Sequence, residues 1–265
     1  MTAVAYAAEA AGQATEHAEG GVHVVLRAEQ IGQFLGLPIT NSLLMTWLVM
    51  AVLIVFAVLF RRKLALIPGK FQAGIEWLFE GVLDYMTETL EDAKLARRFF
   101  PLVMTIFLFV FIGNEMAFLP GIGSIGVTTA EGFTPLFRAP SADLNFTLAL
   151  AFIAFFTIEI TSLAVLGFFK YGGKYVNVKS PVGFVVGIIE VISNLGRIVS
   201  FSFRLFGNVF AGEVMLAVAG FFLAFLLPVP LMAFEVFVAF IQAVVFAMLT
   251  LFFIKLGVAD PHAEH

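Results

Sequence analysis

The sequence predicts an all-α polytopic membrane protein with five membrane elements, the last two forming a long, steeply tilted helical hairpin. Of the 265 residues, 61% are hydrophobic and only 13% are charged, whereas about a quarter are charged in an average soluble domain. The mean hydropathy is +1.01. So little polar surface indicates a lipid bilayer as the solvent, where an open strand cannot satisfy its backbone groups.

The composition also excludes several classes of function. A net charge of −4 without a long basic run argues against nucleic-acid binding. Cysteine is absent, so a thiolate nucleophile or metal ligand is excluded. The histidines lie near the two ends of the chain, at His17, His23, His262 and His265. We therefore expect no metal, no cofactor and no small-molecule substrate other than a transported ion.

The N-terminal third contains a tail, one span and an amphipathic segment. Residues 1–41 are mostly small and polar and are predicted to form an external tail, whereas 42–265 form one integral membrane domain. The tail lacks the basic start and apolar run of a secretory signal; a cleaved leader is the alternative. The first span, 43–60, contains no charge. An apolar stripe over about 71–90 then predicts a helix that lies on the cytoplasmic leaflet or packs against the bundle or other subunits.

The remaining chain supplies four more membrane elements. A transmembrane helix needs about 20 apolar residues, and three segments fit one crossing each: 99–119, 144–169 and 231–256. The stretch 181–227 is too long for one upright crossing, because a continuous helix of this length spans roughly 70 Å against a hydrocarbon core of about 30 Å. It must be broken or steeply tilted. We expect Pro228 and Pro230 to end it and turn the chain into the last helix.

Lysine and arginine are unequally divided between the connecting segments. The 61–98 loop carries seven and the 170–180 loop carries three, whereas the other side has only Arg27 and Arg138. The excess of positive charge in cytoplasmic loops places the N-terminus outside and both basic loops in the cytoplasm. Five crossings then leave the C-terminus in the cytoplasm. The glycine-rich 120–142 segment becomes an external turn region.

Seven ionisable side chains fall inside the predicted membrane segments: Glu115, Glu159, Glu190, Arg197, Arg204, Glu213 and Glu235. Each costs roughly 2.5–3.5 kcal/mol at a helix centre, so such residues line water, pair with one another or move ions. Structural alternatives exist for some of them. Arg197 can pair with Glu190, Glu159 can bond to a neighbouring helix, and Glu115 can lie at the interface.

Helical spacing arranges these charges on the long helix. Glu190, Arg197 and Arg204 are seven residues apart, so they share one face, with Ser200 and Asn208 close to it. An arginine stays protonated and cannot relay a proton, yet it attracts a carboxylate and favours its ionised form. Arg204 is therefore suited to separating two polar access routes, one from each side of the membrane.

The acids of the last two helices lie toward the outside. Glu213 follows Arg204 by nine residues, which places it half a turn away from the arginine. The last helix runs in the opposite direction, so Glu235 reaches the same depth as Glu213 across the hairpin. Gln242 shares the face of Glu235, and by itself it is typical of an interhelical hydrogen bonder.

Residues 202–213 carry a specific motif. The run S-F-R-L-F-G-N-V-F-A-G-E resembles the signature R-L-F-G-N-x-x-A-G-E of subunit a of F-type ATP synthases. Residues 140–145 resemble the start of that family's third span, Asn114 with 119–121 the end of its second, and 242–246 its last helix. The resemblance extends from about residue 40 to the C-terminus.

The resemblance implies a non-catalytic stator subunit of the cell inner membrane that couples proton transport to ATP synthesis, with the rotating c-ring and the peripheral-stalk b subunits as partners. It implies that Arg204 meets the ion-carrying carboxylate of each c subunit. The other implied proton-translocation residues are Ser200 and Asn208 beside the arginine, Gln242, Glu190 on the cytoplasmic side, and Glu213 with Glu235 on the outer side. Glu159 and Arg197 are further candidates without a firm motif.

Two features leave alternatives open. Many bacterial relatives carry a histidine where Glu235 stands, and two close acids tend to share a proton. The ion is either a proton or sodium, because the c subunit largely makes that choice. A self-contained secondary ion transporter is the competing function. It predicts two similar halves and helices broken at mid-membrane, and no such repeat occurs in the sequence.

Overall fold

The computed structural model describes residues 28–34, 37–119, 121–122, 125–129, 132–167, 181–223 and 226–258. Within these residues, five helices are long and apolar enough to cross a membrane. They are α2 (Asn41–Arg62), α4 (Ala93–Ala117), α5 (Leu144–Leu166), α7 (Pro181–Phe222) and α8 (Pro228–Val258). The predicted all-α polytopic membrane fold is thus confirmed. Most of the expected tail, the basic loop at 170–180 and all four histidines lie outside the described residues.

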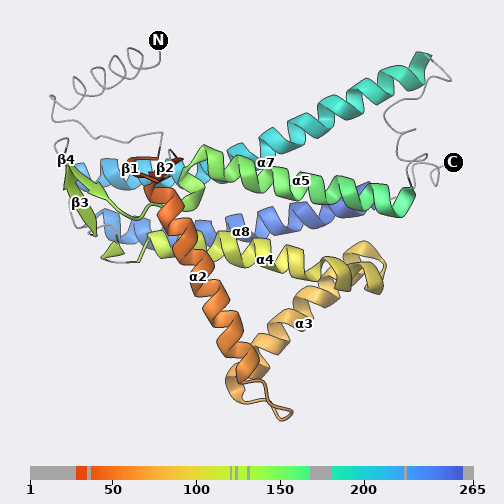
Figure 1. Ribbon diagram of the computed structural model, residues 1–265, viewed down its shortest axis with the longest axis horizontal. Coiled ribbons are helices and arrows are strands. Elements are labelled where there is room, and N and C mark those ends of the chain that lie inside the picture. The colour runs from red at the N-terminus through yellow and green to blue at the C-terminus, as the bar shows by residue number, and fades with distance from the viewer. Residues whose placement is uncertain are drawn as a thin grey trace.

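The core of the molecule is a bundle in which α4 packs along α8, and α5 packs along both α7 and α8 (Figure 1). One apolar cluster joins α4, α5, α7 and α8 through buried residues that include Ile106, Leu150, Leu205 and Phe246. The N-terminal part of α7 diverges from α5 (Figure 1). Only the middle and C-terminal parts of α7 are therefore held firmly against the other helices.

The long helix α7 is continuous over 42 residues, which excludes the broken alternative. At 1.5 Å per residue it extends about 63 Å, so it is far longer than one upright crossing requires. The expected role of two prolines is corrected. Pro228 and Pro230 do not precede the last helix but lie in the first turn of α8. A proline is tolerated there because the first backbone N–H groups of a helix have no partner within it.

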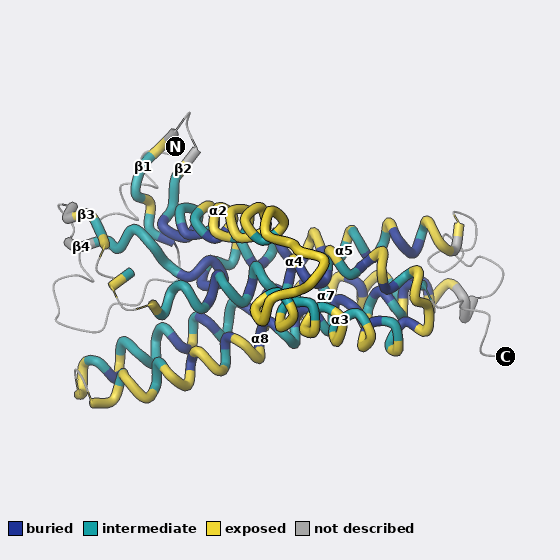
Figure 2. Tube along the Cα trace, turned by 90° about the horizontal axis from the view of Figure 1, so that it is seen from below, coloured by how far each residue is buried: buried dark blue, intermediate teal, exposed yellow. Residues whose placement is uncertain are grey.

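The helices α2 and α3 each contact the bundle at one end and diverge from it at the other (Figure 1). Thr40 caps α2 by accepting a hydrogen bond from the backbone N–H of Leu43 at 3.3 Å. The buried residues of α2 all lie in its first half, and the rest of the helix is largely exposed (Figure 2). The amphipathic helix is present as α3 (Lys70–Leu90), whose buried residues Met86 and Leu90 pack with α4 and α8. Its N-terminal half, with Trp77, is exposed.

Two short antiparallel hairpins lie at one end of the bundle (Figure 1), and the sequence did not predict them. They pair β1 (Gln30–Phe34) with β2 (Leu37–Thr40), and β3 (Gly126–Thr129) with β4 (Gly132–Pro135). A 3-10 helix, η2 (Pro140–Ala142), follows β4 and is fully buried. It contacts α2, α4, α5 and α7, and it therefore fixes the chain just before α5 against the bundle.

Candidate functional site

Arg204 lies on the exposed side of a firmly anchored turn of α7. Its neighbour Leu205 is completely buried, and the ring of Phe201 packs edge-on against Phe246 of α8 with 4.9 Å between ring centroids. Arg204 itself is exposed. Nearby on the helix, Val199 and Phe203 are also more than half exposed. The arginine therefore projects from an exposed side of α7, with apolar side chains beside it, while the opposite face of the helix packs in the core.

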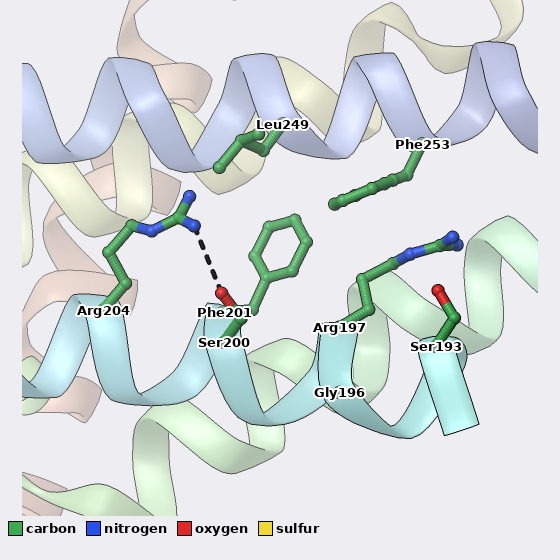
Figure 3. Close-up of a pocket in the computed structure, with 8 residues that line it drawn as sticks. All are labelled: Ser193, Gly196, Arg197, Ser200, Phe201, Arg204, Leu249 and Phe253. Atoms are coloured by element: carbon green, nitrogen blue, oxygen red, sulfur yellow. Dashed lines mark hydrogen bonds between the residues drawn. The ribbon is translucent and has the colours of Figure 1, made fainter. Parts of the chain in front are cut away.

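A cavity of about 260 Å³ lies between α7 and α8, and Arg204 forms part of its wall. We call it the inner cavity, because the orientation predicted from the sequence places it toward the cytoplasm. Its α7 wall carries two arginines and two serines (Figure 3); the lining residues are Ser193, Gly196, Arg197, Ser200, Phe201, Arg204, Leu249 and Phe253. The Arg204 Nη2 donates a hydrogen bond to Ser200 Oγ at 3.2 Å. The structure thus brings together Arg197, Ser200 and Arg204, which the helical spacing had placed on one face.

Arg197 makes a contact that the sequence did not predict. Its guanidinium carbon lies 4.2 Å from the centre of the Phe253 ring on α8 (Figure 3). A cation over an aromatic face is attracted by the ring quadrupole. This contact ties the polar face of α7 to α8 beside the inner cavity.

Glu213 lines a second cavity of about 380 Å³, which we call the outer cavity because the predicted orientation places it toward the outside. This cavity lies at the end of the bundle that carries the hairpins, and its polar lining residues are Glu29, Asn41, Arg138 and Glu213. Glu213 forms an ion pair with Arg138, whose Nη2 and Nε donate to Glu213 Oε2 at 2.7 Å and 3.1 Å. The two side chains are only 12% and 24% exposed.

Arg138 is the residue that sequence reasoning missed. It was noted only as one of two cations on the expected outer side. Because it is 75 positions from Glu213, no helical periodicity connects the two. Two features of the sequence point to Arg138. It lies two residues before the 140–145 motif, and an acid inside the membrane, such as Glu213, needs a counter-charge.

Glu235 is 5% exposed and approaches α7 very closely. A Cβ atom added to Gly212 would overlap the Glu235 carboxylate, so only a glycine leaves room for this contact. Because Gly212 precedes Glu213, the two acids lie at the same level across the α7–α8 pair, as the antiparallel hairpin requires. They are not equivalent, since Glu213 is held by Arg138.

The other predicted residues lie apart from these two cavities. Gln242 is buried on α8, and its Nε2 has no hydrogen-bond partner among the described residues. Asn208 is half-buried on α7, as are Glu190 on α7 and Glu159 on α5. Asn114 on α4 is completely buried, and neither polar atom of its carboxamide has a partner in the described part of the chain.

Comparison with known proteins identifies the family. The profile of the family described as ATP synthase A chain matches residues 43–255. The chain is 34% identical to ATP synthase subunit a of Campylobacter concisus over 218 residues, which cover 82% of this chain and 89% of the relative. It is 32% identical to the same subunit of Desulfotalea psychrophila over 264 residues, which cover 91% and 99%. The chain belongs to the ATP synthase subunit a family.

In this subunit a chain, the matched region contains the whole inner cavity and most of the outer one. The outer cavity is completed by two residues that precede the match, Glu29 and Asn41. The backbone N–H of Asn41 donates to the Glu29 carbonyl at 3.1 Å, which fixes the start of β1 to the start of α2. The wall of the outer cavity therefore combines the family region with the segment before it.

Proposed function

We propose that the chain is the stator subunit of a rotary ATP synthase and provides two aqueous half-channels that pass protons to and from a c-ring. The observation that carries the proposal is the presence of two separate cavities along α7, each with charged side chains in its wall. Arg204 lines one of them, and Glu213 lines the other. Membership of the subunit a family supports the same reading.

The side chains of the inner cavity suit a route by which protons leave the c-ring toward the cytoplasm, with Arg204 at its closed end. Two serine hydroxyls line it and can order water, whereas Arg197 and Arg204 keep their charge at any physiological pH. A guanidinium cannot pass a proton onward, so the inner route stops at Arg204. A carboxylate that comes close to Arg204 is favoured in its ionised form and gives up its proton.

The outer cavity, unlike the inner one, leads to side chains that can pass a proton on, because carboxylates accept and release protons. Glu213 lies in its wall and Glu235 lies beside Gly212, on the helix that faces α7. Together they form a path by which a proton arriving from outside reaches the α7–α8 pair. In this proposal, Gln242 and Asn208 extend the polar path toward Arg204, and Glu190 lies on the cytoplasmic side of Arg204.

The surface around Arg204 suits a rotating apolar partner. Val199 and Phe203 are 52% and 53% exposed, so exposed apolar side chains flank the arginine on the helix surface. A ring of small helical hairpins with one carboxylate per subunit supplies both the apolar contact and the charge that Arg204 attracts. The exposed half of α2 offers a separate apolar surface for the membrane helices of peripheral-stalk subunits.

A self-contained transporter is less well supported. Inverted-repeat transporters bind their ion at helices broken near mid-membrane, whereas α7 and α8 are continuous over 42 and 31 residues. The proposed orientation keeps the N-terminus outside and the C-terminus in the cytoplasm, following the distribution of lysine and arginine. The proposed ion is the proton, and sodium is the alternative.

Purification of the tagged chain from its own membranes in mild detergent tests this function. The proposal predicts that a ring of small helical-hairpin subunits and a soluble ATPase head purify with the chain. It also predicts that the reconstituted complex acidifies liposomes when ATP is added. A chain that purifies alone and moves ions without those partners would instead establish the transporter function.

A further inference from the structure

We infer that Arg138 is a positioning residue of the outer proton route: its guanidinium fixes the orientation of the Glu213 carboxylate and must be displaced each time a proton binds there. The inference rests on the proposed function and adds to it a second arginine with a separate task. Arg204 lies on the exposed face of α7 and lines the inner cavity, whereas Arg138 controls an acid in the outer cavity.

The geometry of the pair supports a specific interaction. Arg138 uses both Nη2 and Nε on Glu213, with the shorter distance at 2.7 Å. Two N–H donors on one carboxylate fix its orientation. Both side chains are largely withdrawn from solvent, so the attraction is screened less than that of a surface pair.

The backbone around Arg138 is held rigidly beside α7. The next residue, Ala139, is buried with Ala142 against Val209 of α7. Val209 precedes Glu213 by four residues and therefore lies on the same face, one turn away. The side chain at position 138 is thus positioned near Glu213 by the buried residues that directly follow it.

The groups around the Arg138–Glu213 pair determine where the guanidinium can go when Glu213 binds a proton. The charged and titratable groups on the elements around it are Glu29 before β1, Glu115 on α4, Asp143 at the start of α5 and Glu235 on α8. The rest of the cavity wall is mainly apolar. When Glu213 takes up a proton, the guanidinium keeps its charge and loses its partner. Glu29 is the other carboxylate in the same cavity wall, and it is the group toward which the released guanidinium can turn.

This arrangement gives Arg138 a measurable effect on proton uptake. An adjacent cation competes with a proton for a carboxylate, so a proton that enters the outer route has to displace Arg138 from Glu213 in the wild type but not in a variant without Arg138. Proton conduction through the outer route should then depend on pH differently. A merely structural ion pair would change the amount of assembled complex but not the shape of this pH profile.

The experiment uses the whole complex in liposomes and measures passive proton conduction while varying the pH of the compartment that faces the β hairpins. Arg138→Gln is expected to shift the profile to higher pH. Arg138→Lys, which keeps the charge, should restore most of the wild-type profile. Arg62→Gln is the matched control, because Arg62 is an exposed arginine at the far end of α2, and its profile should match the wild type.

Two outcomes would overturn the inference. One is an unchanged profile for Arg138→Gln in a complex that still conducts protons. The other concerns the double variant. If Arg138→Gln shifts the pH profile of a Glu213→Gln complex as much as it shifts the wild-type profile, its effect does not act through Glu213. If the Arg138→Gln complex fails to assemble, the Arg138→Lys complex gives the answer. A strongly shifted pH profile in an assembled Arg138→Lys complex, which retains the charge, would also overturn the inference. A wild-type complex that conducts no protons contradicts the proposed function itself and is therefore distinguishable.

Discussion

The carboxylate of Glu235 on α8 lies directly against the backbone of Gly212 on α7. Gly212 is followed by Glu213, so the contact places two acids from different helices at one level of the bundle. It also makes the glycine a steric requirement of the proposed proton path, since any side chain at position 212 occupies the space of the carboxylate.

Gly212→Ala is expected to displace Glu235 and to lower passive proton conduction by about tenfold. The overlapping atoms are the far end of a flexible side chain, which can move aside at little cost, so the unfolding temperature should change little. Gly207→Ala is the matched control on the same helix, because a Cβ there meets no atom within 4 Å. Equal conduction in the two variants would show that the Glu235 position does not matter.

Glu235→Gln and Glu213→Gln are each expected to slow proton uptake from the outer side, because an amide cannot accept the proton in transit. Initial rates of passive proton conduction, measured with a fixed pH difference, check this prediction. Of the two, Glu213→Gln should also reduce the amount of assembled complex, since it leaves the Arg138 charge without the carboxylate that it binds. Unchanged conduction in the double variant would remove both acids from the path.

An exposed ion pair at the opposite end of the bundle predicts a separate, pH-dependent effect. Lys255 Nζ donates to Glu91 Oε1 at 2.8 Å, and this hydrogen bond, together with the lysine charge, holds the pKa of the Glu91 carboxyl below its usual value. Because the folded-state pKa is lowered, the contribution to stability is complete above the usual carboxyl pKa. It is lost as the pH falls through the lowered one.

Lys255→Gln should therefore lower the unfolding temperature slightly at neutral pH and have no effect at a pH where Glu91 is protonated. The effect is expected to be small, since exposed ion pairs contribute little. Thermal unfolding of the two proteins in the same detergent over a series of pH values gives the comparison. A difference in unfolding temperature that stays constant down to the lowest pH would assign the effect to packing of the lysine side chain.

The sequence was sufficient for features that depend on local periodicity. The five membrane helices follow from apolar runs, which the bilayer makes unusually informative. The shared face of Arg197, Ser200 and Arg204 follows from helical spacing alone, and these residues do line one cavity. The position of Glu213 and Glu235 at the same depth of the bundle follows from the antiparallel direction of two adjacent helices.

Features that depend on long-range placement could not be predicted in this way. The Arg138–Glu213 pair joins a loop to a helix 75 residues later, and nothing in either segment specifies the other. The strands β1 to β4 are too short to give a clear alternation. Pro228 suggested a helix end because proline breaks helices, but it also begins them, and the sequence does not distinguish these two roles.

The most direct test of the central claim is ATP-driven proton pumping by a complex that carries Arg204→Ala. The account predicts that the complex assembles with its ring, because Arg204 is exposed and the buried neighbour Leu205 is unchanged, but that it pumps no protons. Arg197→Ala, an arginine of the same helix and cavity, should retain part of the activity. Normal pumping by the assembled Arg204→Ala complex would contradict the account.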